Sequence, residues 1–291
     1  MIADAPLPEG MRHGGRYRDW RPAPPRYLVA DVDGTLVGVE PHATEAVVGA
    51  LSRAQDAGLR VGFATGRMLA AVRPLWERTR LPGPHVLHNG ALVRAGGKTI
   101  ASWPLAGDQA RRLLELCDQH DLYAELYVGD GYVVTDRRPQ ATVHWEMLHQ
   151  EPDGLARDLD LDAVEVAKAT VAVFEGDAQP TIELLDGAGL ATATATSPQA
   201  PGVTFINVTH PDASKGVALR TAAEHIGVPL AAVVAVGDDW NDLPMLELVG
   251  TAIAMGQAPE EVQAAAHLVV PEVDADGVVH ALDASIAWTD A

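Results

Sequence analysis

Strand and helix patterns alternate in two separate parts of this 291-residue chain, and this alternation constrains the fold more than any other feature. In the first part, residues 27–31 (YLVAD) and 59–65 (LRVGFAT) are short apolar runs, and residues 43–58 between them have apolar side chains at helical spacing. Strands that are apolar on both faces indicate a parallel sheet with helices on each side. We therefore predict an α/β fold with a Rossmann-like, doubly wound and mainly parallel sheet.

The same pattern returns near the C-terminus. Residues 214–227 have helical spacing and end at Gly227, and residues 231–237 (AAVVAVG) read as a fully buried strand. The pattern then continues with a helix at 243–250, a strand at 251–256, a helix at 259–266 and a short strand at 267–270. Both ends of the chain are thus predicted to build one core.

The middle of the chain has a different pattern. Between residues 106 and 204, hairpin-like strands with the turn dipeptide Asp130-Gly131 are separated by helical runs such as 107–120. This indicates an inserted α+β cap domain. The predicted organisation is a flexible N-terminal leader at 1–25, a core at 26–105 and 205–291, and a cap at 106–204.

Composition excludes several classes of function. The formal charge of −19 argues against nucleic acid, because binding a polyanion requires many Lys or Arg side chains. No window approaches the ~18 apolar residues of a membrane-spanning helix, and residues 1–26 lack the apolar centre of a secretory signal. With one cysteine, Cys117, no internal disulfide can form. We expect a cytoplasmic protein without nucleic-acid or membrane partners, and its oligomeric state stays unknown.

Polar residues follow the predicted strands at the edge where an open parallel sheet binds ligands. They form three segments at strand ends, 31–35 (DVDGT), 65–67 (TGR) and 237–242 (GDDWND), and a fourth, 214–216 (SKG), opens a helix. Because the carboxyl ends of parallel strands lie at one edge, we expect these segments to converge on one crevice.

The four aspartates of these segments suggest metal-assisted phosphoryl chemistry. Asp31, Asp33, Asp238 and Asp242 supply the hard oxygen ligands that suit Mg²⁺. A carboxylate that faces a metal-bound phosphate can attack phosphorus, and a second carboxylate can exchange a proton with the leaving oxygen and with water.

The remaining residues suit the phosphoryl group itself. The Thr65 hydroxyl and the Lys215 ammonium can bind its oxygens. Gly34 and Gly66 allow backbone N–H groups to approach the transferring group. Together with the aspartates, these residues predict a phosphotransferase or phosphatase site.

The ordered set DVDGTL, ATGR, SKG and GDDWND resembles the four signature motifs of the haloacid dehalogenase-like (HAD) superfamily. The segments HNGAL at 88–92 and DGVVHAL at 276–282 resemble its Cof-type branch, in which an α+β cap lies between the second and third motifs. The resemblance covers the core, roughly residues 27–92 and 205–291. Asp239 departs from the usual pattern, because the family often has a small or neutral residue there.

The resemblance implies a role for each matching position. Asp31 would be the nucleophile and Asp33 the general acid/base. Thr65 and Lys215 would bind the phosphoryl group, with Asn241 near it. Asp31, the main-chain carbonyl of Asp33 and Asp238 would hold Mg²⁺, and Asp242 would support them. Asn89 lies in a segment that the family places near the active site, and Arg67 is expected either to meet the substrate or to pair with a core acid.

The function predicted from the sequence is a Mg²⁺-dependent phosphoric monoester hydrolase that acts through an aspartyl-phosphate. Asp33 argues against dehalogenation, which lacks that acid/base residue in this superfamily. A sugar phosphomutase and a non-catalytic binding module with the same fold are the alternatives. The cap carries 18 acidic and 6 basic residues, which disfavours polyanions and favours small monophosphates, with sugar phosphates fitting best.

Overall fold

The computed structural model describes residues 7–8, 10–21, 23–38, 40, 42–197 and 199–289. The chain divides into two compact units. The first contains the described residues of 1–66, 74–101 and 214–291, and the second contains 67–73 and 102–213. No helix in the described part of the chain has the length and apolar character needed to cross a bilayer.

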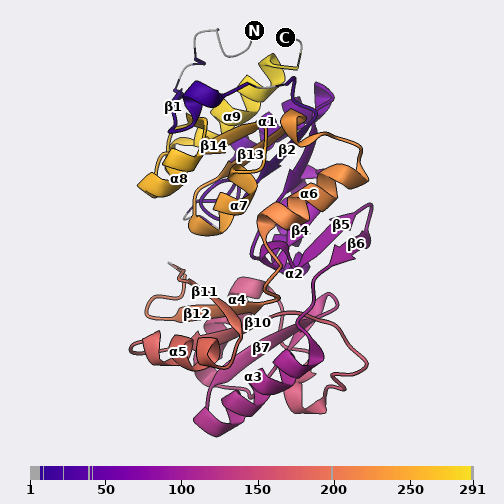
Figure 1. The fold of residues 1–291 in the computed structure, drawn as a ribbon, viewed down its shortest axis with the longest axis vertical. Helices are drawn as coiled ribbons and strands as arrows, with labels where there is room; N and C mark the ends of the chain where they lie inside the picture. The colour runs from indigo at the N-terminus through magenta and orange to yellow at the C-terminus, as the bar shows by residue number, and fades with distance from the viewer. Residues whose placement is uncertain are drawn as a thin grey trace. The chain divides into compact units, whose positions relative to one another are not determined.

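The first unit is built on a six-stranded sheet with the order β1-β15-β14-β13-β2-β3 (Figure 1). Its strands are β1 (Arg12–His13), β2 (Tyr27–Ala30), β3 (Arg60–Phe63), β13 (Val233–Gly237), β14 (Thr251–Ala254) and β15 (Leu268–Val269). All neighbours pair in parallel except β1, which is antiparallel to β15. The predicted mainly parallel sheet is therefore confirmed, and its four residues in β2 are all buried, as expected of a strand with helices on both sides.

Helices pack on this sheet in two groups. One consists of α1 (Glu45–Asp56) and α9 (Gly277–Ala287), which contact each other, and the other of α6 (Lys215–His225), α7 (Leu243–Leu246) and α8 (Glu260–Ala265). Beyond β3, a parallel bridge between Ala64 and Val86 leads to a small sheet of β4 (His85–Leu87), β5 (Leu92–Ala95) and β6 (Lys98–Ser102). The helix α2 (Leu69–Thr79) contains one of the points where the chain passes from one unit to the other.

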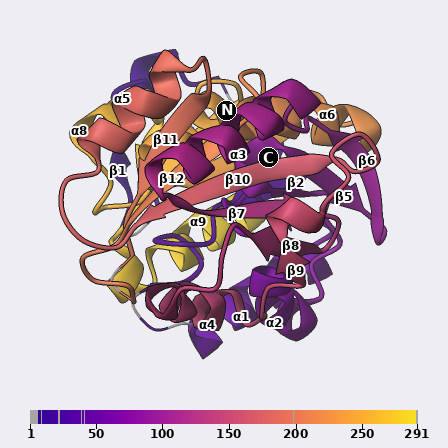
Figure 2. The same cartoon turned by 90° about the horizontal axis from the view of Figure 1, so that it is seen from below.

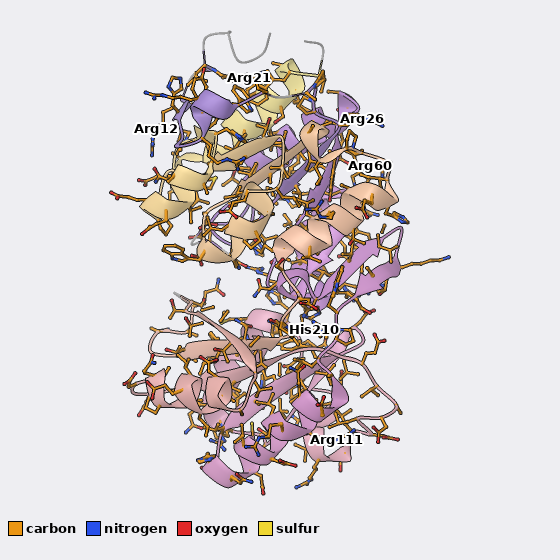
Figure 3. The ribbon with its side chains drawn as sticks, viewed as in Figure 1. Arg12, Arg21, Arg26, Arg60, Arg111 and His210 are labelled. Carbon is orange, nitrogen blue, oxygen red and sulfur yellow. The ribbon has the colours of Figure 1, made fainter. Side chains whose placement is uncertain are left out.

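The N-terminal segment differs from the sequence prediction. Residues 1–25 are predicted as a flexible leader, but within the described residues β1 extends the sheet and Trp20 is only 2% exposed. The Trp20 indole donates to the Thr251 hydroxyl at 3.1 Å and packs edge-on against Trp288. Arg12 and Arg21, labelled in Figure 3, also lie in this segment. The Pro, Gly and Arg content of the N-terminal segment does not indicate that Trp20 packs in the core.

A substitution at Trp20 tests whether this segment stabilises the core. Trp20→Phe removes the hydrogen bond to Thr251 and leaves a small cavity, so the free energy of unfolding should fall by about 2 kcal/mol. Urea denaturation measures this change. Trp240→Phe, at an exposed position, is the matched control and should change stability by less than about 0.5 kcal/mol. Equal stability of both variants would show that the segment contributes nothing.

The second unit is a six-stranded sheet with the order β11-β12-β10-β7-β8-β9. Its strands are β7 (Tyr123–Val128), β8 (Gly131–Val134), β9 (Gly154–Leu155), β10 (Val166–Val173), β11 (Ala191–Ala195) and β12 (Thr204–Thr209). The hairpin of β7 and β8 turns at residues 129–130, one residue before the dipeptide expected from the sequence, because Gly131 already pairs with Val128.

Alternate residues of this sheet face two separate apolar clusters. Ala124 and Leu126 pack with α3 (Gly107–His120) and α5 (Gln179–Gly187), whereas Tyr123 and Tyr127 pack with α4 (Thr142–Leu148). Figure 2 shows α3 and α5 on one side of the sheet and α4 on the other. Cys117 is buried in the first cluster.

The limits of this unit differ from the predicted cap at 106–204. The unit extends to residue 213, because β12 pairs with β10 and β11 and not with a strand of the first unit. It also includes 67–73, where Met68 and Ala71 pack in the cluster with Tyr123. Local patterns identify these strands, but their pairing partners depend on contacts between distant segments.

Candidate active site

Asp31 and Asp33 lie at the end of β2, on a tight loop over 31–37. Asp31 follows the last residue of the strand, is 5% exposed, and its backbone N–H donates to Val236 of β13 at 2.9 Å. Backbone bonds from Leu36 and Val37 to the Val32 carbonyl close the loop. The Asp33 side chain is exposed at this loop. The strand therefore buries one carboxylate and leaves the other in contact with solvent.

Lys215 is buried between two of these acids. It opens α6, where the Ser214 hydroxyl accepts a hydrogen bond from the Val217 N–H as the helix cap. The Lys215 ammonium lies 2.8 Å from an Asp31 oxygen and 2.7 Å from an Asp242 oxygen, with 1% of the residue exposed. It also donates to the Asn241 side chain at 3.3 Å.

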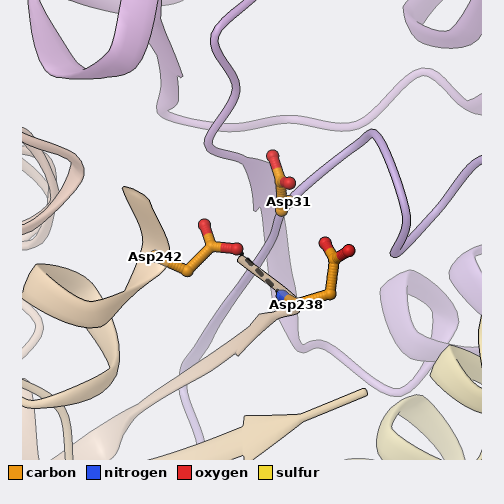
Figure 4. A group of neighbouring side chains, drawn as sticks. All are labelled: Asp31, Asp238 and Asp242. Atoms are coloured by element: carbon orange, nitrogen blue, oxygen red, sulfur yellow. Dashed lines mark hydrogen bonds between the residues drawn. The ribbon is translucent and has the colours of Figure 1, made fainter. Parts of the chain in front are cut away.

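Asp31, Asp238 and Asp242 form a cluster in which one oxygen of each residue lies within 4.8 Å of the others. Figure 4 shows these three side chains, with the backbone N–H of Asp238 donating to Asp242. Because three carboxylates gather here and the Lys215 ammonium contacts two of them, the cluster has an excess of negative charge. A divalent cation with oxygen ligands fits this chemistry.

Burial and the neighbouring charges shift the pKa values of Asp31 and Asp238. Burial raises the pKa of Asp31 well above its usual value, Lys215 lowers it, and Asp242, Asp238 and Asp33 raise it again. Burial and the neighbouring Asp242 raise the pKa of Asp238 to about 7. Burial lowers the pKa of Lys215, but Asp242 and Asp31 together bring it above its usual value, so the ammonium stays charged.

Asp242 and Asp31 differ in the hydrogen bonds that their carboxylates accept. One Asp242 oxygen accepts from Lys215, and the other accepts from the backbone N–H groups of Asp238 and Asp239 at 2.9 and 3.1 Å. By contrast, within the described part of the chain no hydrogen bond reaches the second oxygen of Asp31. Asp242 is thus suited to hold the loop and the lysine, and Asp31 to react or to bind a cation.

Two close backbone approaches make glycine necessary here. Gly34 has φ +79°, and a Cβ atom added to it would lie 2.1 Å from an Asp238 oxygen. A Cβ atom at Gly237 would lie 2.5 Å from the Asp242 carboxylate. These glycines allow the loop after β2 and the loop after β13 to bring their acids together.

Thr65, Gly66 and Asn89 form the side of the site that follows β3. Thr65 is buried, its N–H donates to the Val86 carbonyl, and its own carbonyl accepts from the Asn89 N–H. Asn89 has φ +56°, and its side-chain oxygen accepts from the Asn241 amide at 3.1 Å. A Cβ atom at Gly66 would lie 3.0 Å from that Asn89 oxygen. The structure therefore brings Asn89 and Asn241 together.

Arg67 is the one predicted site residue that belongs to the second unit. Its guanidinium donates to the carbonyl of Ala71, in the first turn of α2, at 3.3 Å. Its proposed contact with substrate stays a prediction.

Two further residues contact the acids and were not singled out from the sequence. The Thr35 hydroxyl donates to one Asp238 oxygen at 3.1 Å. The Gln257 amide donates to the Gly34 carbonyl at 2.6 Å and to the other Asp238 oxygen at 3.4 Å, while its oxygen accepts from the Val273 N–H. Gln257 follows β14, the next parallel strand, so its position at a carboxyl strand end was the available signal.

A buried lysine between aspartates, at the carboxyl edge of a parallel sheet, suits phosphoryl transfer, because the ammonium can bind phosphoryl oxygens beside a carboxylate nucleophile. The sequence profile of the haloacid dehalogenase-like hydrolases matches residues 28–282. The chain therefore belongs to the haloacid dehalogenase-like hydrolase family, as its motifs predict, and by class is a phosphoric monoester hydrolase.

Relatives with curated names match over most of their length. The pyridoxal phosphate phosphatase YbhA of Escherichia coli is 27% identical over 266 residues, which cover 87% of this chain and 96% of that protein. The 5-amino-6-(5-phospho-D-ribitylamino)uracil phosphatase YitU of Bacillus subtilis is 26% identical over 265 residues, 88% of this chain and 96% of that protein. Among solved structures, the HAD phosphatase BT1666 of Bacteroides thetaiotaomicron has a TM-score of 0.74 at 26% identity, covering 90% of this chain and 95% of its own.

Proposed function

We propose that this protein is a Mg²⁺-dependent phosphatase that hydrolyses small phosphomonoesters through an aspartyl-phosphate on Asp31. The observation that carries the proposal is the buried Lys215 ammonium, held 2.8 Å from Asp31 and 2.7 Å from Asp242, beside the Asp238 carboxylate. Asp31 and Asp238, with the main-chain carbonyl of Asp33, would hold the ion. The bound ion would offset the repulsion between the phosphate and the Asp31 carboxylate.

The first step transfers the phosphoryl group to the protein. An Asp31 oxygen forms a bond to phosphorus while the bond from phosphorus to the ester oxygen breaks. The Asp33 carboxyl group gives its proton to that oxygen, so the alcohol leaves neutral. Asp33 can serve in this way because its side chain is exposed at the loop.

The second step releases phosphate. The Asp33 carboxylate takes a proton from water, the water oxygen bonds to phosphorus, and the bond to Asp31 breaks. Lys215, Thr65 and the backbone N–H groups near Gly34 and Gly66 would bind the phosphoryl oxygens in both steps. Asp242 would keep Lys215 and the Asp238 loop in place, through the bonds to both of its oxygens.

Relatives support small metabolites as the substrate class. The named relatives act on pyridoxal phosphate and on a phosphorylated ribitylaminouracil. Sugar phosphates, expected from the sequence, and a cytoplasmic location stay predictions. A screen of phosphate release over small phosphorylated metabolites, with Mg²⁺ and with a chelator, tests the proposal. Release that is equal in both conditions would contradict the role of the metal.

The raised pKa of Asp238 predicts how Mg²⁺ stabilises the protein at different pH. Since its pKa is about 7 in the folded protein, Asp238 keeps a proton there over a range where the unfolded chain has lost it. The metal-free protein should therefore lose stability as pH rises from about 4 through 7. Mg²⁺ must displace that proton, so its apparent affinity should be roughly tenfold higher at pH 8 than at pH 6.

The shift in melting temperature on adding Mg²⁺, measured at both pH values, checks this prediction. Asp238→Asn should remove most of the shift. Asp283→Asn is the matched control, because Asp283 forms only an exposed ion pair with Arg53, and it should leave the shift unchanged. A shift of the same size at pH 6 and pH 8 would contradict the assignment.

A further inference from the structure

Trp240 is an exposed tryptophan within the site. Its side chain belongs to the turn Trp240–Asp242, and the residue is 52% exposed. In the described part of the chain, the large apolar residues that are exposed are Trp76, Val217 and Trp240, and Trp240 is the most exposed of them. Its indole takes part in no ring contact or side-chain hydrogen bond among the described residues. The core therefore makes no use of this side chain.

The backbone of Trp240 is held firmly on both sides. The Asp239 carboxylate accepts from the Trp240 N–H at 2.8 Å, and the Asp239 N–H donates to Asp242. On the other side, Asn241 contacts both Lys215 and Asn89. Trp240 lies two residues from Asp238 and two from Asp242, so its Cα atom is within about 7.6 Å of theirs. The backbone that carries the indole is thus held beside the acids of the site.

The polar groups beside Trp240 are already engaged. The Asn241 side-chain oxygen accepts from Lys215, and its nitrogen donates to Asn89. Both Asp242 oxygens accept hydrogen bonds, and Asp239 caps the turn. The Trp240 indole is the large apolar group that this turn leaves exposed, so it offers a leaving group an apolar contact. A flat ring can lie against the indole face over its whole area, whereas a puckered saturated ring contacts that face at fewer atoms.

We propose that Trp240 is a specificity-determining residue that stacks on a flat, unsaturated ring of the leaving group, so that the preferred substrates are phosphate esters of alcohols that carry such a ring. This inference rests on the proposed phosphatase function and narrows its substrate class. The indole offers a π face to the ring, an arrangement that is favourable in offset or edge geometry.

Two esters that differ only in the flatness of the ring test the proposal. Benzyl phosphate and cyclohexylmethyl phosphate have the same linkage between a six-membered ring and the phosphate. Trp240→Ala should lower kcat/KM for benzyl phosphate by about 10- to 100-fold, the range found when an aromatic stacking partner of a nucleic-acid base is removed. The factor for the cyclohexylmethyl ester should be clearly smaller. Trp240→Phe should keep most of the wild-type preference.

Trp76→Ala is the matched control, since it removes another partly exposed indole, whose contacts are to Leu81 and His85. It should leave the ratio between the two esters unchanged. An equal loss of kcat/KM for both esters in Trp240→Ala would show that the indole does not distinguish flat from saturated rings. No loss for either ester would show that the indole does not contact the leaving group. Each of these results overturns the proposal.

Equilibrium binding separates this inference from the proposed activity. Benzyl phosphate is titrated calorimetrically into the Asp31→Asn protein with and without Trp240→Ala, where the ester is expected to stay intact. The second substitution should weaken binding by about 10- to 100-fold. If the wild-type protein releases no phosphate from any ester, the proposed function fails. The binding comparison still decides the role of Trp240, and it is made in the wild-type background as well. Equal affinities with and without Trp240→Ala would overturn the inference about Trp240.

Discussion

Asp31→Asn is expected to lower phosphate release from any accepted phosphomonoester by roughly 10⁴-fold or more, because the amide oxygen is a poor nucleophile. The protein should stay folded. Since the ionised form of Asp31 is disfavoured by its burial and by the neighbouring acids, a neutral residue of the same shape removes an unfavourable charge. The melting temperature of the metal-free variant should therefore equal or exceed that of the wild type.

Asp33→Asn provides the matched comparison. It keeps the nucleophile and removes the proton donor, so the rate should fall by about 10²–10⁴-fold. Under brief exposure to substrate, this variant can accumulate the phosphorylated protein, which intact-mass spectrometry detects, and the Asp31→Asn variant cannot. Unchanged turnover in Asp31→Asn would overturn the assignment of the nucleophile.

Lys215→Met is expected to have the largest effect on stability. It leaves Asp31 and Asp242 buried without their shared cation, and loss of one partner from a buried ion pair typically costs about 3–5 kcal/mol. The free energy of unfolding, measured by urea denaturation without metal, should fall by this amount. Phosphatase activity should be lost as well, because the ammonium would also bind the phosphoryl group.

The control for this variant is Lys98→Met, at an exposed position of β6. It should change the free energy of unfolding by less than about 0.5 kcal/mol. Addition of Mg²⁺ should restore part of the stability of Lys215→Met, because the ion supplies positive charge to the same acids. A loss below about 1 kcal/mol in Lys215→Met would show that the lysine does not offset the buried carboxylates.

The acids and the lysine could be found from the sequence because their signals are local. Asp31 and Asp238 each follow an apolar run, and Lys215 follows a helix-capping serine. In a parallel sheet these ends meet at one edge, so their convergence could be expected. The different roles of Asp31 and Asp242 could not be predicted from the sequence, because they depend on which oxygen accepts which hydrogen bond.

The sequence by itself determined the alternation of strands and helices, the order of the motifs and the acids that meet at the sheet edge. It could do so because apolar periodicity and strand ends are properties of short segments. Only the tertiary structure decided that Trp20 packs in the core, that β12 belongs to the second sheet, that Thr35 and Gln257 contact Asp238, and that Trp240 stays exposed. These features depend on contacts between segments far apart in the chain, and no local pattern encodes which side chain fills or leaves a given space.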